Sequence, residues 1–242
     1  MNKSKMNVLH IVNNFGVGGL ESVIRHLAMT STDGIYPHVC VLSKAGRFST
    51  TVSDAGIPLY HMDRKNKAKR TKACLREIIG LINKWEIDVL HCHDISSWFF
   101  GVISGHKSRK PIVMTKHGNL ENWNIKTILL TKILSMSTNR IVAVSPETKK
   151  DLVKRQFVKE KKIKVIFNGI DMGPFQNQIS KRDARLRLGL SDECFVTGTI
   201  TRFYPVKNIK AQIKMVTALK DEIPGLKHLI VAPIATDYGR QI

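Results

Sequence analysis

Glycines lie close together near the amino terminus, in a pattern that suits anion binding. Gly18 and Gly19 follow a short apolar run and precede Glu21 at the start of a helical pattern. A glycine-rich turn that opens a helix lets backbone N–H groups approach an anion. The segment is not a G-x-G-x-x-G fingerprint, because Glu21 stands in the third glycine's place, and it lacks the G-K-[ST] of a Walker sequence. The spacing fits an anion site and a plain tight turn equally well.

Three histidines stand at the ends of short apolar runs. His91 and His93 are two residues apart, so on a strand they share one face and form a candidate metal pair. The sequence shows no third ligand at a suitable spacing, which favours strand-end histidines in hydrogen bonds and predicts no metal. His117, beside Gly118, stands where the end of a strand would touch a bound ligand, although a histidine there also serves structural roles.

Two cations flank a turn near the carboxyl terminus. Arg202 follows an apolar run, and Lys207 stands at the start of the next helical pattern. Two cations near the amino terminus of a helix suit a diphosphate. Solvated surface charges are the alternative interpretation.

A further set of cations is concentrated in one short segment. Six of nine consecutive residues are basic: Arg64, Lys65, Lys67, Lys69, Arg70 and Lys72. Such a run is usually a solvated loop, but cations near an anionic leaflet contribute about 1 kcal/mol each. The run therefore predicts contact with an anionic membrane surface.

The overall charge also indicates an anionic partner. Lys and Arg number 39 against 19 Asp and Glu, which gives a formal net charge of +20. There is no helix-turn-helix, RNA-binding or zinc pattern, and aromatic residues make up only 7%, so a nucleic-acid partner is not expected. A membrane surface or a phosphorylated substrate is the better expectation.

The cysteines and the amino terminus indicate the compartment. Cys40, Cys74, Cys92 and Cys194 are scattered, which predicts neither a structural zinc site nor a disulfide framework and favours a reducing compartment. The amino terminus lacks an apolar core of signal-peptide length, and no apolar stretch approaches the roughly 18 residues that span a bilayer. The sequence thus predicts a cytoplasmic protein, in peripheral contact with the inner face of the cell membrane.

Short apolar runs rich in Val and Ile alternate with longer helical patterns. The predicted strands cover 8–12, 38–42, 88–91, 112–115, 140–144 and 164–167, and the predicted helices lie near 20–31, 71–85, 96–106, 125–137 and 146–156. This alternation predicts a doubly wound α/β domain with a parallel sheet. Ligands of such sheets bind beyond the carboxyl ends of the strands, where the glycine turn and the histidines fall. Ser145, and either Asp94 or Ser96, are expected to cap helices.

The pattern changes near residue 169. Turn residues over 169–181 predict a linker, and a new unit follows with helices near 181–188 and 207–222 and strands over 195–200 and 228–231. A β-α-β unit of this size leaves apolar faces uncovered and is marginal by itself. The expected organisation is a Rossmann-like domain over 1–172, a linker and lead-in helix over 173–190, and an incomplete second Rossmann-like domain over 191–242.

Six segments occur in a characteristic order over about residues 6–233. They are VLHIVNNFGVGGLESVIRHLA, DVLHCHD, TKHG, RIVAVSPETKKDL, VIFNGIDMGPF and GTITRFYPVKN. Each is a weak signal alone, but the ordered series resembles glycosyltransferase family 4, retaining enzymes of the GT-B fold. The similarity is greatest to bacterial enzymes that build exopolysaccharide, capsule or lipopolysaccharide.

The resemblance implies roles for several residues. The donor would be a UDP- or GDP-linked sugar and the acceptor a glycan or lipid-linked molecule, with no metal cofactor. Gly18 and Gly19 would lie near the donor diphosphate, and Arg202 and Lys207 would neutralise it as it leaves. His117 would be the catalytic residue that hydrogen-bonds the transferred sugar. The other residues expected to line the cleft are Glu21, His93, Ser145 and Asn168.

Two departures from the family pattern concern the second domain. The family carries two glutamates eight positions apart that hold the donor, and this sequence has no such pair. The segment IVAPIA stands where the family tends to have a glycine-rich strand end. We therefore expect a truncated transferase with little activity by itself. The alternative is a non-catalytic remnant or an acceptor- or membrane-binding domain without a donor site; a sugar-nucleotide epimerase is a weaker option.

Overall fold

The computed structural model describes residues 5–62, 70–118, 124–176 and 179–232. The chain divides into two compact units, residues 1–171 and 172–242. This division falls near the domain boundary expected at 172 and places the expected linker with the second unit. Each unit is described by itself below, as unit 1 and unit 2.

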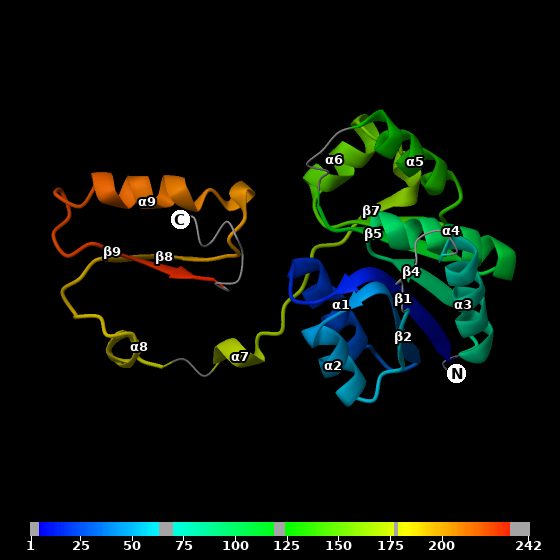
Figure 1. The fold of residues 1–242 in the computed structure, drawn as a ribbon, viewed down its shortest axis with the longest axis horizontal. Coiled ribbons are helices and arrows are strands. Elements are labelled where there is room, and N and C mark those ends of the chain that lie inside the picture. Colours follow the sequence, from blue (N-terminus) through cyan, green and yellow to red (C-terminus); the bar gives the residue numbers. More distant parts are fainter. Residues whose placement is uncertain (1–4, 63–69, 119–123, 177–178, 233–242) are drawn as a thin grey trace. The chain divides into compact units, whose positions relative to one another are not determined.

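A sheet of seven strands forms the centre of unit 1 (Figure 1). Its strand order is β3-β2-β1-β4-β5-β6-β7, and all neighbours are parallel. The chain therefore builds outward from β1 to β3, returns to the other side of β1, and builds outward again to β7. This confirms the doubly wound α/β fold. The strands are β1 Met6–Phe15, β2 Ile35–Ala45, β3 Leu59–His61, β4 Val89–Cys92, β5 Ile112–Lys116, β6 Arg140–Ala143 and β7 Ile163–Val165.

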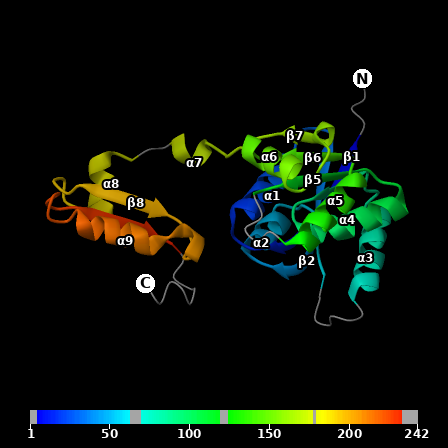
Figure 2. The ribbon, with the colours of Figure 1, turned by 90° about the horizontal axis from the view of Figure 1, so that it is seen from above.

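Helices cover both faces of this sheet (Figure 2). Residues of β1 point alternately to opposite layers up to Val12, and after the register shift between Val12 and Asn14 Phe15 shares the layer of Val12. Leu9 and Ile11 pack with side chains of α3 and α4, whereas Val12 and Phe15 pack with α1 and α2. The helices of unit 1 within the described residues are α1 Gly19–Met29, α2 Arg47–Asp54, α3 Arg70–Lys84, α4 Ile95–Ser108, α5 Ile125–Met136 and α6 Pro146–Lys154, with a 3-10 turn, η1, at Glu160–Lys162.

Helix α4 lies especially close to the strands beneath it. A Cβ added to Gly101 would collide with the Sγ of Cys92 on β4, and one added to Gly105 would lie 2.7 Å from the Ile112 side chain. Only glycine permits this separation, because contacts of that length exclude a side chain. The close packing fixes α4 over β4 and β5, whose carboxyl ends carry histidines.

Cysteines contribute to the same cores. Cys40 on β2 and Cys74 on α3 belong to one core cluster, Cys92 lies beneath α4, and Cys194 is buried in unit 2. None of the four forms a disulfide. Burial raises the thiol pKa of Cys40 and of Cys92, so both stay protonated and pack as small apolar groups.

Two elements of unit 1 were not predicted from the sequence. Helix α2 has eight residues with the mostly polar sequence RFSTTVSD, and strand β3 has only three residues. Neither is long enough to show a clear hydrophobic period, which is the main sequence signal for helices and strands. Every strand expected in this unit is present, and β1 and β2 extend several residues beyond the predicted bounds.

Unit 2 is built around two parallel strands, β8 Val196–Ile200 and β9 Lys227–Val231. Helix α9 spans Ile209–Ala218, so the predicted helix near 207–222 begins later and ends earlier than expected. A 3-10 turn, η2, covers Pro205–Lys207, and Asn208 then adopts a positive φ of 47° before α9 begins. Two short helices precede the strands, α7 Gly173–Gln176 and α8 Lys181–Arg187.

No helix among the described residues has both the length and the apolar character needed to cross a bilayer.

Candidate active site

The reversal of strand order between β1 and β4 locates the candidate site. In an open α/β sheet, a crevice forms at the carboxyl ends of the strands where the chain changes direction. Here the backbone N–H of Asn13 on β1 donates to Oδ2 of Asp94, just after β4, over 2.6 Å. This hydrogen bond ties the two strand ends together across the crevice.

Asp94 also begins helix α4. Its Oδ1 accepts from the backbone N–H of Ser97 over 2.9 Å, which confirms Asp94 rather than Ser96 as the cap. Burial raises the pKa of Asp94, while the backbone donors of Ser97 and Asn13 oppose that rise. The carboxylate is thus committed to holding β1, β4 and α4 in register at the crevice.

Four histidines gather at this edge, from three neighbouring strands. His10 Nδ1 lies 3.1 Å from His93 Nε2, and His93 Nδ1 lies 3.1 Å from His117 Nε2. His91 stacks on His93 with ring centroids 4.2 Å apart, and its Nε2 lies 2.7 Å from the hydroxyl of Thr115 on β5. The result is a hydrogen-bonded chain of three imidazoles, His10–His93–His117, that ends at the strand edge; we call it the histidine chain.

The histidine chain links the tautomers of its three rings. A neutral imidazole carries one N–H, so each ring that accepts at one nitrogen must donate from the other. If His10 donates to His93, then His93 donates to His117, whose own proton stands on Nδ1. If the direction is reversed, Nδ1 of His117 is an acceptor. That nitrogen is buried and has no hydrogen-bond partner among the described residues.

Burial keeps these rings uncharged at neutral pH. Desolvation lowers the pKa of His10 to about 4, with a smaller contribution from His38. It also lowers the pKa of His117 to about 4, with Lys116 as the second cause. Burial moves the pKa of His91 and of His93 well below the usual range, and the neighbouring imidazoles add to the effect.

The same rings also have the composition of a metal site. Ligand nitrogens of His10, His91 and His93 all lie within 4.8 Å of one another, so the third histidine missing from the sequence pattern comes from β1. His10 and His93 already share a hydrogen bond, and His91 pairs with Thr115. Hydrogen bonding therefore accounts for one nitrogen of His10, one of His91 and both of His93, and the absence of a metal remains a prediction.

A pocket of about 360 Å³ opens beside the histidine chain. The residues that line it include His93, Asp94, Trp98, Lys116, His117 and Gly118. Burial lowers the pKa of Lys116, whereas the charge of Asp151 raises it. The pocket thus combines neutral imidazoles, a carboxylate and a largely buried amine at the carboxyl ends of β4 and β5. Such a set of donors and acceptors suits a polyhydroxylated ligand.

The glycine turn lies next to this crevice, between β1 and α1. Gly18 is the extended N-cap of α1, Gly19 is its first residue, and Glu21 stands in the first turn. No side chain caps this helix end, and a Cβ on Gly19 would meet nothing within 4 Å. Its free N–H groups and partial positive charge are therefore available to an anion.

Two further predicted cleft residues lie at later strand ends. Ser145 follows β6 and caps α6, accepting from the Thr148 N–H over 3.1 Å, which confirms its predicted capping role. Asn168 is exposed after β7. A cleft contact for either residue remains a prediction.

Arg202 and Lys207 belong to unit 2. Arg202 follows β8 and lies over the Tyr204 ring, 5.2 Å from its centroid. Lys207 ends the 3-10 turn η2 and stands two residues before α9, so it lies just before the helix rather than within its first turn. Both are exposed. Their joint contact with a diphosphate remains a prediction.

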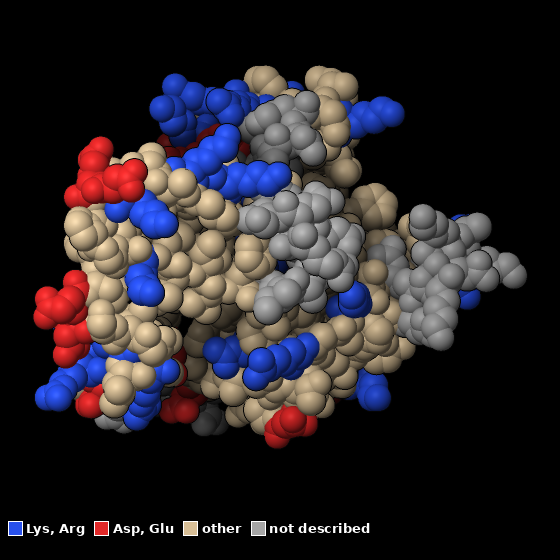
Figure 3. Space-filling model, turned by 60° about the vertical axis from the view of Figure 1, so that its left-hand side comes forward, with Lys and Arg blue, Asp and Glu red and all other residues tan. Residues whose placement is uncertain are grey.

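The predicted membrane run falls largely outside the described residues. Arg64, Lys65, Lys67 and Lys69 lie there, Arg70 begins the backbone of α3, and Lys72 is exposed. Elsewhere, Figure 3 shows one face on which Lys and Arg side chains form several separate groups.

Sequence reasoning missed two contributors to the site. His10 lies within an apolar strand, and only its polar character among Val and Ile residues marks it. Asn13 acts through its backbone N–H, which leaves no trace in side-chain type. A polar residue inside a buried strand near a predicted switch point is the signal that would have found His10.

Comparisons with known proteins agree with this architecture. The E. coli protein UDP-Gal:alpha-D-GlcNAc-diphosphoundecaprenol alpha-1,3-galactosyltransferase is 32% identical over 142 residues, covering 55% of this chain and 37% of that protein. The structure of Anabaena Alr3699/HepE in complex with UDP and glucose has a TM-score of 0.80 at 20% identity, covering 98% of this chain and 64% of that one. A UDP-GlcNAc 2-epimerase from Neisseria meningitidis has a TM-score of 0.64 at 15% identity, with 98% and 67% covered.

The chain corresponds to only part of each of these proteins. The chain spans just over a third of the E. coli relative and under two thirds of the Anabaena structure. The two structural likenesses show the shared GT-B type fold. The sequence profile described as Glycosyltransferase Family 4 matches residues 17–173, which include the glycine turn, His93 and His117. The chain therefore belongs to glycosyltransferase family 4.

Proposed function

We propose that this chain takes part in transferring a sugar from a UDP- or GDP-linked donor to a glycan or lipid-linked acceptor, with retention of configuration. One observation carries the proposal. His117 stands at the carboxyl edge of the sheet, beside a pocket, with a buried Nδ1 that has no partner among the described residues. A buried polar atom without a partner is costly, and a bound sugar hydroxyl would satisfy it.

The neutral state of His117 suits that role. Its pKa of about 4 keeps the ring uncharged at pH 7, so it can hydrogen-bond a sugar hydroxyl without attracting the donor phosphates away from their own site. His93 and His10 would act as positioning residues, since their hydrogen bonds fix the orientation and tautomer of His117. His117 is the proposed catalytic residue.

We assign donor-phosphate binding to the glycine turn within unit 1 and, as a separate prediction, to Arg202 and Lys207 within unit 2. A nucleoside diphosphate leaves with growing negative charge, and fixed positive groups that face it lower the barrier. The uncapped N–H groups at Gly18 and Gly19 supply one such field, with Glu21 nearby. Arg202 and Lys207 would supply another. With these groups in place, the proposed reaction uses no metal cofactor.

The name of one relative supports the proposed acceptor class. The E. coli relative acts, by its name, on a diphosphoundecaprenol-linked sugar. We assign a glycan or lipid-linked acceptor to this chain, with Ser145 and Asn168 at the cleft edge and the basic run at 64–72 near an anionic leaflet. Replacing the six cations of the run with Ser should reduce flotation with anionic vesicles; equal flotation would contradict the run's role.

A transfer assay on the native full-length protein tests the function. We expect nucleoside diphosphate release from one member of a panel of UDP- and GDP-sugars, in the presence of a polyprenyl-diphosphate-linked acceptor, and an axial or equatorial product bond that matches the donor's. His117→Ala should lower kcat by about 10²–10³ with little change in KM. His61→Ala, on the exposed edge strand β3, is the matched control. Inversion, or activity within a few-fold of wild type for His117→Ala, would contradict the proposal.

One observation favours the alternative, acceptor or membrane binding without transfer. Among the described residues of unit 2, only Cys194 and Ile209 are buried apolar side chains. A unit so lightly packed is a weak platform for a donor site. Titration of the chain with UDP distinguishes transfer from binding without transfer. UDP binding that is weakened by Arg202→Ala and by Lys207→Ala would support transfer.

A further inference from the structure

Helix α5 carries its apolar and polar residues in a reversed arrangement. Its exposed side chains include Ile125, Leu129, Ile133 and Met136, with exposed fractions of 66%, 51%, 61% and 67%. Its buried positions include the hydroxyl residues Thr131 and Ser135. A helix that only packs on a sheet has the opposite distribution. The exposed side chains therefore require an explanation beyond folding.

The exposed residues form one continuous stripe. At about 100° per residue, the four apolar side chains fall within roughly 80° of one another, on the side away from Leu134. The stripe is about 17 Å long, since the rise is about 1.5 Å per residue. Lys132 and Lys126, both exposed, flank it on its two sides. We call this surface the α5 stripe.

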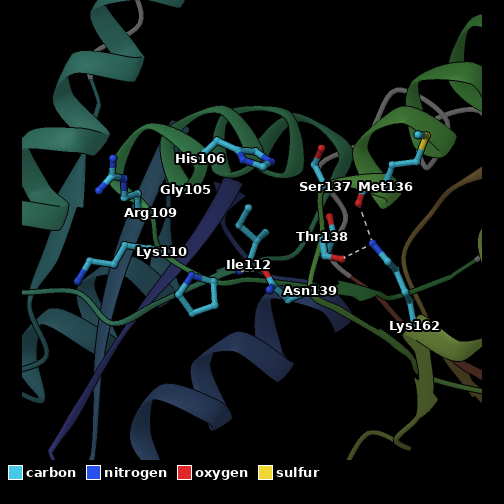
Figure 4. Close-up of a pocket in the computed structure, with 11 residues that line it drawn as sticks. Gly105, His106, Arg109, Lys110, Ile112, Met136, Ser137, Thr138, Asn139 and Lys162 are labelled. Carbon is cyan, nitrogen blue, oxygen red and sulfur yellow. Dashed lines mark hydrogen bonds between the residues drawn. The ribbon is translucent and has the colours of Figure 1, made fainter.

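A basic pocket lies at the carboxyl-terminal end of the α5 stripe (Figure 4). The pocket has a volume of about 660 Å³ and shares Met136 with the stripe. It lies at the amino-terminal ends of β5 and β6, opposite the edge that carries the histidines. His106, Arg109, Lys110 and Lys162 contribute positive or basic side chains to it.

Lys162 fixes the end of the helix within this pocket. Its Nζ donates to the backbone carbonyls of Ser135, Met136 and Thr138, over 2.9, 2.7 and 2.8 Å. Figure 4 shows this ammonium directed at the last turn of α5. The three bonds use all its donors, so Arg109 and Lys110 remain as the other cations among the residues that line the pocket. The acid nearest in sequence, Glu160, pairs with Lys149 over 2.7 Å.

We propose that the α5 stripe, with its flanking lysines and the basic pocket at its end, docks on an anionic lipid bilayer. The apolar side chains would enter the interface between headgroups and acyl chains, as an amphipathic surface helix does. Lys126 and Lys132 would contact headgroup phosphates on either side, and the pocket would receive one headgroup beside Met136.

Charge favours a bilayer over a second copy of the chain. Two copies would bring their lysine rims together in a chain that carries a net charge of +20, and like charges disfavour that contact. An anionic leaflet instead complements the rim. The proposal does not depend on donor chemistry, so it can fail while the transferase proposal stands, and the reverse.

Vesicle binding by the full chain tests the proposal. We expect cosedimentation with phosphatidylcholine vesicles that contain phosphatidylglycerol, weaker binding without it, and weakening by salt. Leu129→Ser with Ile133→Ser should lower the partition coefficient by about tenfold or more, because two apolar side chains no longer enter the membrane. Leu186→Ser with Leu188→Ser is the matched control, since both leucines are exposed at the basic helix α8, and it should bind as wild type.

A fluorescent label separates the bilayer from other occupants. The four native cysteines are buried, so Ile133→Cys takes an environment-sensitive dye selectively. The dye should shift to the blue on adding anionic vesicles and be quenched by lipid-borne quenchers. Unchanged binding of the double variant, equal loss in the α8 control, or a dye already buried before vesicles are added would overturn the proposal. So would a concentration-dependent dimer that the double variant abolishes.

Discussion

The two units use the same local plan, parallel strands joined through a helix, but they bury very different amounts of apolar surface. Unit 1 holds seven strands with helices on both faces, and it contains every buried apolar side chain of the described residues except Cys194 and Ile209. In unit 2, Ile200 on β8 is 87% exposed, and Val231 on β9 is 57% exposed. The pairing of β8 with β9 is continuous, whereas β1 and β2 have a register shift between Val12 and Asn14. Regular secondary structure therefore does not by itself make a core.

The difference follows from how cores grow. Each strand added to a sheet allows its neighbours to bury their faces against covering helices, so burial rises faster than chain length. In unit 1, β1 has a strand on each side and contributes side chains to two of the three core clusters. In unit 2, α9 buries only Ile209 among its residues. We expect unit 2 to open without disturbing unit 1.

Hydrogen exchange should reveal the largest contrast between the units. Amides in the middle of β1 should exchange at least about 10³-fold more slowly than those of β8, because opening unit 2 breaks few apolar contacts. Mass spectrometry of peptides covering 8–12 and 196–200 provides the measurement. Matching protection in the two peptides would show that the units unfold together.

Acid should destabilise unit 1 through the histidines. His10 has a folded pKa of about 4 against its ordinary value of 6.5, so between these pH values the unfolded chain binds more protons. The free energy of unfolding is therefore fully retained above pH 6.5 and falls as pH drops towards 4, by about 2 kcal/mol at pH 5 from His10 alone. Urea unfolding at pH 7.5 and pH 5 measures it.

A pair of variants isolates that pH effect. His10→Gln should reduce the loss of stability between pH 7.5 and pH 5, because one titrating ring is removed. Val12→Ala, on the same face of the same strand, should lower stability at both pH values without altering the difference between them. An unchanged pH dependence in His10→Gln would mean that this ring does not stay neutral in the fold.

Helix caps give the smallest and most local contrast. Ser145 caps α6 in unit 1, and Ser180 caps α8 in unit 2, each accepting from a backbone N–H over 3.1 Å. Ser145→Ala should lower the free energy of the main unfolding transition by about 1 kcal/mol. Ser180→Ala should leave that transition in place if unit 2 opens separately. Equal shifts in the melting of unit 1 would argue against independent units.

The sequence predicted most of the sheet and only part of the site. Strands such as β5 and β6 stand out as short runs with Val and Ile, so the fold follows from the alternation of such runs with helices. Helix α2 and strand β3 are too short to show a period. His117 and His93 were found because they stand at strand ends, whereas His10 joins them only through the pairing of β1 with β4. That register, and the Asn13 backbone contact, are tertiary facts that a linear pattern does not contain.

The buried thiols can report how often each unit opens. A protonated, enclosed cysteine reacts with an alkylating reagent only while the surrounding structure is open, so its labelling rate reports how often that opening occurs. The labelling rates of Cys40, Cys74 and Cys92 would report opening of the seven-stranded sheet, and the labelling rate of Cys194 would report opening of unit 2. A ligand that stabilises one unit would slow the labelling of the cysteines in that unit and leave the labelling rate in the other unit unchanged. The native cysteines can therefore show, without an engineered probe, which unit a ligand binds.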